Sequence, residues 1–194
     1  MPDINGIPYV ESGDLVSAYP TVSQDLAQEV SDQLASKLAH VHTETISAVG
    51  SVSINSVFNS TYDTYKILID GAASTTTASR LRWRVGGVDN SDNQYIVQLI
   101  SADNTSISGS RATSTSFGFG TGTTAGYANE IEVWNIAKAT ATIAQANLIN
   151  DATATPVTRN TWLGHNVSTA YDGLTFLVDS GTFTGTIRIY GYVN

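Results

Sequence analysis

The chain has 194 residues, of which 41% are hydrophobic and only 13% are charged, and its formal net charge is −8. The hydrophobic share supports one packed domain of ordinary size, while the absence of cysteine excludes a disulfide scaffold, a thiol nucleophile and a thiolate metal site. The acidic balance, without a cluster of Lys and Arg, excludes a nucleic-acid footprint.

Signals for membrane insertion or secretion are missing from the sequence as well. No apolar run reaches the roughly 18 residues that a membrane span needs. The N-terminus also lacks the basic and then apolar pattern of a signal peptide. We therefore expect a soluble protein that is made in the cytoplasm and does not insert into membranes.

Residues 1–20 show neither helical nor strand periodicity, and three prolines favour an extended chain. Apolar side chains such as Ile7, Tyr9 and Leu15 are scattered through the segment, whereas a disordered tail is more polar. We interpret residues 1–20 as an extended arm that docks on another protein. The alternative is a segment that folds back on its own domain.

Residues 21–42 form the only stretch with apolar side chains at helical spacing. These side chains are three or four positions apart and so share one face of an α-helix. They are Leu26, Val30, Leu34, Leu38 and Val41. Thr21 is a suitable N-cap for this helix. Because one helix leaves such a face exposed, we expect residues 21–45 to form a trimerising helix and linker, with these five side chains packed between copies in a parallel homotrimer.

His40 and His42 stand two residues apart where the helical pattern ends. Two imidazoles in one chain do not complete a metal coordination sphere. Around a threefold axis they become six, enough for an octahedral transition-metal ion on the trimer axis. The alternative is a pair of solvated histidines at a helix end, where they interact favourably with the helix dipole. No other cofactor is expected.

Residues 46–194 read as a β domain, because short alternating or β-branched runs are separated by turns rich in Gly, Asn, Asp and Ser. A first strand should run from Ile46 to Phe58 with a bend or bulge at Gly50. The further predicted strands are Tyr65–Ile69, Arg80–Val85, Tyr95–Ser101, Ser114–Phe119, Glu130–Ile136, Thr142–Ile149, Thr161–Val167, Leu174–Val178 and Thr184–Tyr192. The pattern predicts a mainly β fold, an antiparallel, jelly-roll-like β-sandwich preceded by the arm and one short helix that forms a trimeric stalk.

The strand around Arg82 has the clearest alternation in the chain. Leu81, Trp83 and Val85 should face the core, with Arg80, Arg82 and Arg84 on the other side. These arginines either bind an acidic ligand or a neighbouring subunit, or they form a solvated strand face.

Motifs for catalysis are missing. The sequence has no Gly-x-Ser-x-Gly elbow, no HExxH helix and no P-loop. Glu130 and Glu132 share a strand face and have the residue types of a glycosidase pair, but exposed acids on a strand are usually plain surface. We expect that the protein is not an enzyme.

The C-terminal stretch Tyr171–Asn194, with its closing SGTFTGTIRIYGY strand, resembles the end of many tailed-bacteriophage virion proteins. The segment Tyr62–Ile69 followed by LRWRV is similar to the opening of the same β domain, and His40-Val41-His42 after KLA resembles the His-x-His near fibre stalks. The resemblance covers roughly residues 37–194. It implies a trimeric virion appendage, such as a tail fibre, minor tail protein or receptor-binding protein, and it transfers no receptor-binding or catalytic residue.

Two functions therefore remain open for this virion protein. We favour a short trimeric tail fibre or spike, anchored to other virion proteins by residues 1–20, whose distal β domain binds a host-surface glycan. The alternative is a capsid decoration or head-fibre protein without a receptor role. Tyr127, Trp134 and Trp162 are the candidate sugar-stacking residues. The candidate distal loops are Gly86–Gln94 and Gly118–Tyr127, and the low charge favours a neutral glycan.

Overall fold

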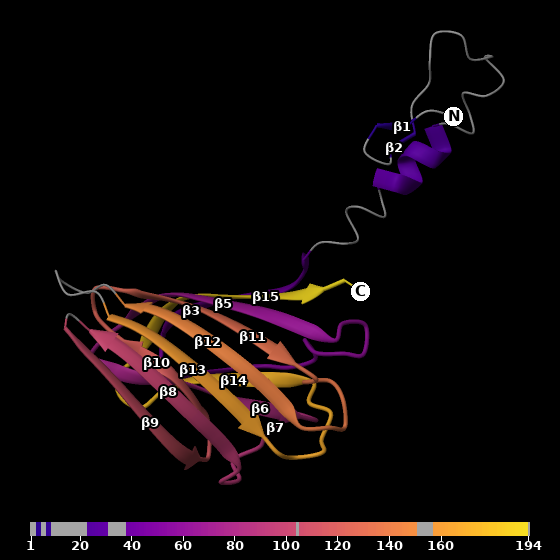
Figure 1. The fold of residues 1–194 in the computed structure, drawn as a ribbon. Helices are drawn as coiled ribbons and strands as arrows, with labels where there is room; N and C mark the ends of the chain where they lie inside the picture. The colour runs from indigo at the N-terminus through magenta and orange to yellow at the C-terminus, as the bar shows by residue number, and fades with distance from the viewer. Residues whose placement is uncertain are drawn as a thin grey trace.

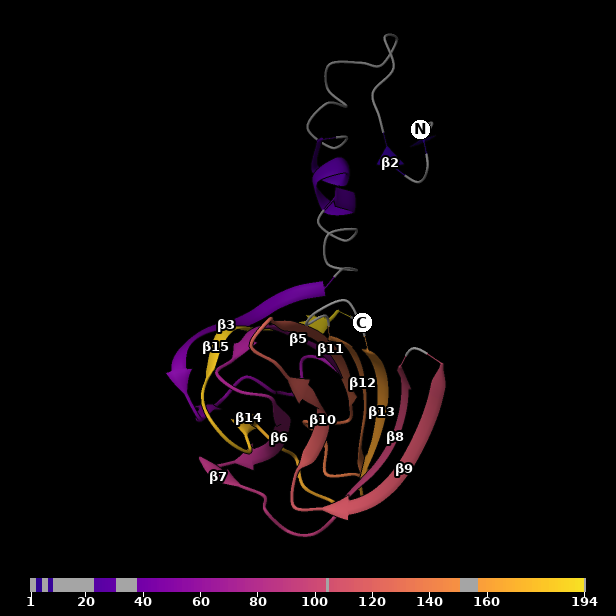
Figure 2. The same ribbon diagram turned by 90° about the vertical axis from the view of Figure 1, so that its left-hand side faces the viewer.

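The structure, a computed structural model, describes residues 3–4, 7–8, 23–30, 38–103, 105–150 and 157–193. Two antiparallel sheets pack face to face as a sandwich, and one short helix precedes them in the chain (Figure 1). The predicted mainly β sandwich is thereby confirmed. The larger sheet curves around the smaller one (Figure 2), and the core lies between them.

The larger sheet has eight strands in the spatial order β3-β15-β5-β11-β12-β13-β8-β9. Its strands are β3 (Leu38–Val49), β5 (Thr64–Ala73), β8 (Tyr95–Asp103), β9 (Ser106–Ser114), β11 (Tyr127–Trp134), β12 (Thr142–Asn150), β13 (Val157–His165) and β15 (Phe183–Tyr192). The edges of the sheet are therefore β3, which begins the domain, and β9.

The smaller sheet has five strands, with β7 paired to β6 beside the order β10-β6-β14-β4. These strands are β4 (Ser51–Ile54), β6 (Thr77–Val85), β7 (Val88–Asp89), β10 (Phe117–Gly122) and β14 (Gly173–Val178). The strands β1 (Asp3–Ile4) and β2 (Ile7–Pro8) pair only with each other. Gly50 is the bend at which the chain passes from β3 to β4, as the sequence predicted.

Strand alternation builds the core. In β11 the side chains from Tyr127 to Val133 at odd positions are buried, whereas Glu130 and Glu132 point outward. The aromatic centre includes Trp83 from the smaller sheet and Tyr65 from the larger one, both fully buried. Each predicted strand has a counterpart. Besides the two-residue strands β1, β2 and β7, the sequence missed β9, which is exposed along nearly its whole length and so has no apolar periodicity.

The predicted helix was wrong at its C-terminal end. The described residues 23–30 are helical, and β3 begins at Leu38, so Leu38 and Val41 lie on a strand. The physical reason is pairing with β15 along β3, which outweighs the helical spacing and packs Val41 against the core. Leu34 and most of residues 1–20 lie outside the described residues.

The two predicted distal loops lie at opposite ends of the sandwich. Residues 86–94 follow β6 at the end where β3 begins, whereas residues 123–126 join β10 to β11 at the other end. Gly118 to Gly122, predicted as loop, belong to β10. The reason is backbone pairing with β6. This pairing stabilises a strand that is rich in glycine and has few side chains of its own to pack. The two loops cannot form one binding tip.

Candidate functional site

The outward face of the eight-stranded sheet is divided into two halves of different chemistry. On β15, β5 and β11 the outward side chains form ion pairs and charged hydrogen bonds. Lys66 Nζ lies 2.6 Å from Glu130 Oε1, and Arg188 Nη1 lies 2.6 Å from Asp70 Oδ1. The hydroxyl of Tyr192 donates to Glu132 at 2.5 Å, and this hydrogen bond to a carboxylate raises the pKa of Tyr192.

These contacts bear on the glutamate pair that has the residue types of a glycosidase site. Glu130 is held by the ammonium group of Lys66 on the neighbouring strand β5, and Glu132 by the phenol of Tyr192 on β15, two strands away. These contacts orient both carboxylates along the surface of the sheet. Both glutamates therefore take part in contacts between outward side chains of the sheet.

The other half, formed by β12, β13, β8 and β9, is poor in charge. Its outward described positions carry amides, hydroxyls, small residues and apolar side chains, with Arg111 as the only charged group. Six exposed large apolar residues gather here: Ile96, Ile100, Ile107, Ile143, Ile149 and Trp162. An apolar surface of this kind with little charge indicates an interaction site.

A hollow of about 430 Å³ lies on this half beside Trp162, which is 37% exposed. Gly164 forms its floor, because a Cβ added there would meet no atom within 4 Å. Ile96 closes one side, and Gln98 and Arg111 provide the polar side. The hollow thus combines an aromatic face, an open floor, an amide and a guanidinium.

A second hollow of about 290 Å³ continues from the first, because Ile96 lines both. Its other lining residues are polar and uncharged: Asn93, Gln94, Thr113 and Asn166. Amides and hydroxyls both donate and accept hydrogen bonds. The two hollows form a groove that runs from Trp162 to the loops at the ends of β8 and β13, and we call it the Trp162 groove.

Buried polar contacts fix the loop end of the Trp162 groove. Nδ1 of His165 lies 3.3 Å from the carbonyl oxygen of Gln94, and Nε2 lies 2.8 Å from the hydroxyl of Tyr171. Since a carbonyl can only accept, Nδ1 carries a proton, and burial lowers the pKa of the imidazole. The Tyr95 hydroxyl accepts the Trp83 amide at 2.9 Å and donates to the Asn90 carbonyl at 3.0 Å.

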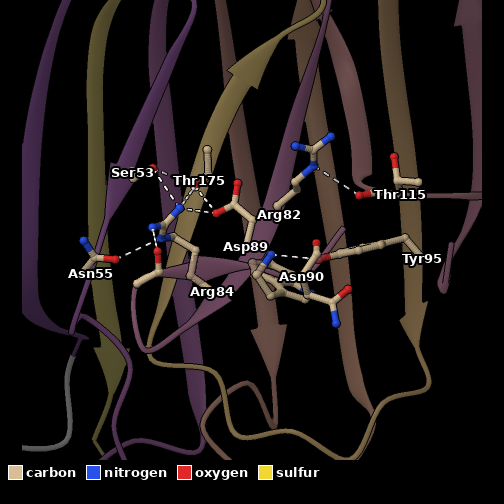
Figure 3. A network of polar contacts seen from close by, with 11 residues as sticks. Ser53, Asn55, Arg82, Arg84, Asp89, Asn90, Tyr95, Thr115 and Thr175 are labelled. Atoms are coloured by element: carbon tan, nitrogen blue, oxygen red, sulfur yellow. Dashed lines mark hydrogen bonds and ion pairs between the residues drawn. The ribbon is translucent and has the colours of Figure 1, made fainter. Parts of the chain in front are cut away.

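Arg84 holds the hairpin that precedes this loop (Figure 3). It forms an ion pair with Asp89 and donates to the carbonyl of Gly87. It also donates to polar side chains of β4, the β4–β5 loop and β14, namely Ser53 at 3.0 Å, Asn55 at 3.0 Å and Thr175 at 2.7 Å. This arginine is 9% exposed and fully engaged by its own chain. Its role is therefore structural.

The other two arginines of β6 are also engaged within the chain. Arg80 forms a two-point contact with Asp179, at 2.5 and 2.6 Å, and Arg82 donates to the Thr115 carbonyl at 3.3 Å (Figure 3). The three arginines lie on the face of β6 opposite the core, as predicted. The core position predicted for Val85 was wrong, because this residue ends β6 and is 43% exposed. Their partners connect β6 with its neighbours.

The three predicted sugar-stacking residues have different positions. Trp162 lies in the Trp162 groove. Trp134 is half-buried on the same face of the sheet, where it pairs with Ile143, and Ile143 pairs in turn with Gly164. Trp134 does not line the groove. The prediction for Tyr127 was wrong. Its side chain points to the core, like that of Ile131 on the same strand, and the residue is only 5% exposed. Its hydroxyl bonds to Ser79 at 2.7 Å, and burial raises its pKa to about 12.

His40 and His42 lie on opposite faces of the larger sheet. His42 pairs with the buried Ile189, whereas His40 pairs with the next residue, Tyr190, across a bulge at Val41. His42 Nε2 lies 3.1 Å from Glu44, and the His40 ring contacts that of Tyr190 edge-on. The described part of the chain contains no group of three His, Asp or Glu side chains arranged to hold a metal.

Sequence reasoning missed most residues of the groove, among them Gln98, Arg111 and Gly164. These three come from three strands, and only the register between these strands brings them together. The sequence carried one partial signal, the alternation of Trp162 and Gly164 on one face of β13.

No protein-family model matches the chain, and neither a curated protein nor a solved structure is significantly similar to it. The described part of the chain contains no helix that is long and apolar enough to cross a membrane.

Proposed function

We propose that the chain is the subunit of a short trimeric bacteriophage tail fibre or spike whose β-sandwich binds a host-surface glycan. The observation that carries this proposal is the exposed Trp162 beside the open floor at Gly164. Sugar rings have apolar faces and a polar edge, so they stack on aromatic side chains while nearby amides bond their hydroxyls. The amide-lined extension of the groove supplies such bonds.

The placement of the apolar helix positions supports the trimeric part of the proposal. Leu26 and Val30 are 38% and 44% exposed in the single chain. Such side chains are buried when helices associate. The resemblance of Tyr171–Asn194 to virion proteins supports the phage context, with residues 1–20 as the attachment to the rest of the virion. A shallow site binds one sugar weakly, and a trimer raises the avidity by presenting three copies.

The test is binding of the full-length protein to a microarray of bacterial surface polysaccharides. Replacing Trp162 by Ala should abolish binding, whereas Trp162→Phe should retain part of it, because a smaller ring still stacks. Since Trp162 is partly exposed, the alanine variant should lose only about 1 kcal/mol of stability. A thermal unfolding curve checks this.

Ile149→Ala is the control, since Ile149 lies on the same face but outside the Trp162 groove. This variant should bind like the unmodified protein. If the unmodified protein binds no member of the array, or if Trp162→Ala binds normally, the glycan-binding function is wrong. A decoration role on the capsid then takes its place.

A further inference from the structure

We propose that the Trp162 groove selects acidic glycans, and that Arg111 binds a carboxylate on the edge of the sugar that stacks on Trp162. This inference rests on the proposed glycan-binding function and names the class of its ligand. Composition alone favours a neutral glycan, because the chain has few charges and a net charge of −8. The local chemistry of the groove differs from that average.

Arg111 differs from every other described basic side chain. Five of them form ion pairs with acids of their own chain: Lys66, Arg80, Arg84, Lys138 and Arg188. Arg82 donates to the Thr115 carbonyl and Arg159 to the Thr121 hydroxyl. Among the lysines and arginines that the structure describes, only Arg111 has neither an ion pair nor a hydrogen bond of its side chain. Its five N–H donors remain available to a ligand.

Strand register places Arg111 at a suitable distance from Trp162. Trp162 pairs with Gln98 across β13 and β8, and Gln98 pairs with Arg111 across β8 and β9. The two residues are therefore two strands apart in one row, roughly 10 Å between backbones. A hexose stacked on the indole over Gly164 directs its edge across Gln98. A carboxylate on that edge then meets the guanidinium at the far wall of the groove.

The surroundings leave the positive charge of Arg111 uncompensated. None of the described residues that line the two hollows carries a carboxylate. The ion pairs of the sheet lie on the other half, on β15, β5 and β11. A planar guanidinium binds a carboxylate through two parallel hydrogen bonds, which a neutral hydroxyl cannot provide. Selectivity for an acidic sugar follows.

The experiment uses the same polysaccharide microarray, with uronic-acid, sialic-acid, phosphate-bearing and neutral members. The best ligand is then compared intact and after chemical reduction of its carboxylates to alcohols. We expect the strongest ligands to carry carboxylates and reduction to weaken binding about tenfold, the effect of one charge-assisted contact. Binding to the intact ligand should also weaken as salt rises.

Arg111→Gln should remove both the tenfold preference and most of the salt dependence. Arg111→Lys should restore the salt dependence but only part of the preference, because an ammonium lacks the two-point geometry. Arg82→Gln is the matched control, since it removes one positive charge from the other sheet and should change neither. Arg111 is exposed on an edge strand, so these variants should fold normally.

The outcomes separate the two proposals. Strong binding that is lost in Trp162→Ala, but is equal for intact and reduced ligands or unchanged in Arg111→Gln, overturns the selectivity for acidic sugars and leaves glycan binding intact. The same holds if the best ligands carry phosphate and no carboxylate. Failure to bind any member of the array overturns glycan binding, and the inference with it.

Discussion

At the scale of single residues, His165 links the stability of the β-sandwich to pH. Its ring is fully buried between the Gln94 carbonyl and the Tyr171 hydroxyl, and burial lowers its pKa below the usual 6.5. The unfolded chain therefore binds a proton more readily than the folded one as pH falls through 6.5. Stability that is present above this pH should be lost below it.

The measurement is chemical unfolding of the full-length protein between pH 7.5 and pH 5.0. We expect the free energy of unfolding to decrease on acidification, with much of the decrease absent in His165→Gln, whatever stability that variant starts from. His40→Gln, at an exposed position, should keep the decrease of the unmodified protein. Equal pH profiles for His165→Gln and the unmodified protein would contradict the assignment.

The alternation of inward and outward side chains along a strand explains which site residues the sequence could predict. Tyr127 precedes a predicted strand whose buried positions, Ile131 and Val133, share its parity, so its place in the core was readable in principle. Trp162, predicted as a sugar-stacking residue, is 37% exposed on β13. Arg111 was not predicted, because its importance comes from being two strands away from Trp162 and from having no partner. Both facts depend on register across the sheet.

At the scale of elements, β5 and β15 approach each other closely at a pair of glycines. Gly71 and Gly185 are opposite in the ladder, and the ring of Phe183 lies against both. A Cβ on Gly185 would lie 2.2 Å from the Asp70 carbonyl oxygen, which is backbone and cannot rotate away. Gly185→Ala should therefore destabilise the domain by about 1–3 kcal/mol.

Gly109→Ala tests whether this loss is specific. Gly109 is on the edge strand β9, where an added Cβ meets nothing closer than 3.4 Å. Alanine there should be neutral or slightly stabilising, because it restricts the unfolded chain. Urea unfolding of both variants measures the difference. Similar stability of the two variants would show that the β5–β15 contact tolerates a side chain.

Element boundaries show where sequence patterns fail. The apolar spacing continues from Leu26 through Val41, yet Leu38 and Val41 lie on strand β3, whereas the described residues 23–30 are helical. Local spacing cannot reveal that β15, near the other end of the chain, offers β3 a partner. The opposite failure is β9, a strand without apolar periodicity that is held by pairing with β8. The buried strands were predictable because burial on one face creates alternation.

At the scale of the whole molecule, we expect three chains associated through their N-terminal helices. Leu26 and Val30 are one turn apart on the helix over residues 23–30, and both are exposed in the single chain. The variant Leu26→Asp, Val30→Asp should dissociate the assembly into monomers, because two carboxylates per chain cannot be buried together. Light scattering of the full-length protein at micromolar concentration measures the mass.

Gln24→Asp provides the control for the helix. Gln24 is on the opposite side of the helix from Leu26, and an acid near a helix N-terminus is favourable, so this variant should remain trimeric. The unfolding transition of the β-sandwich should be similar in both variants, since neither residue belongs to its core. A monomeric unmodified protein would contradict the predicted trimer. The Trp162 groove would then bind its glycan as a single weak site, without avidity from further copies.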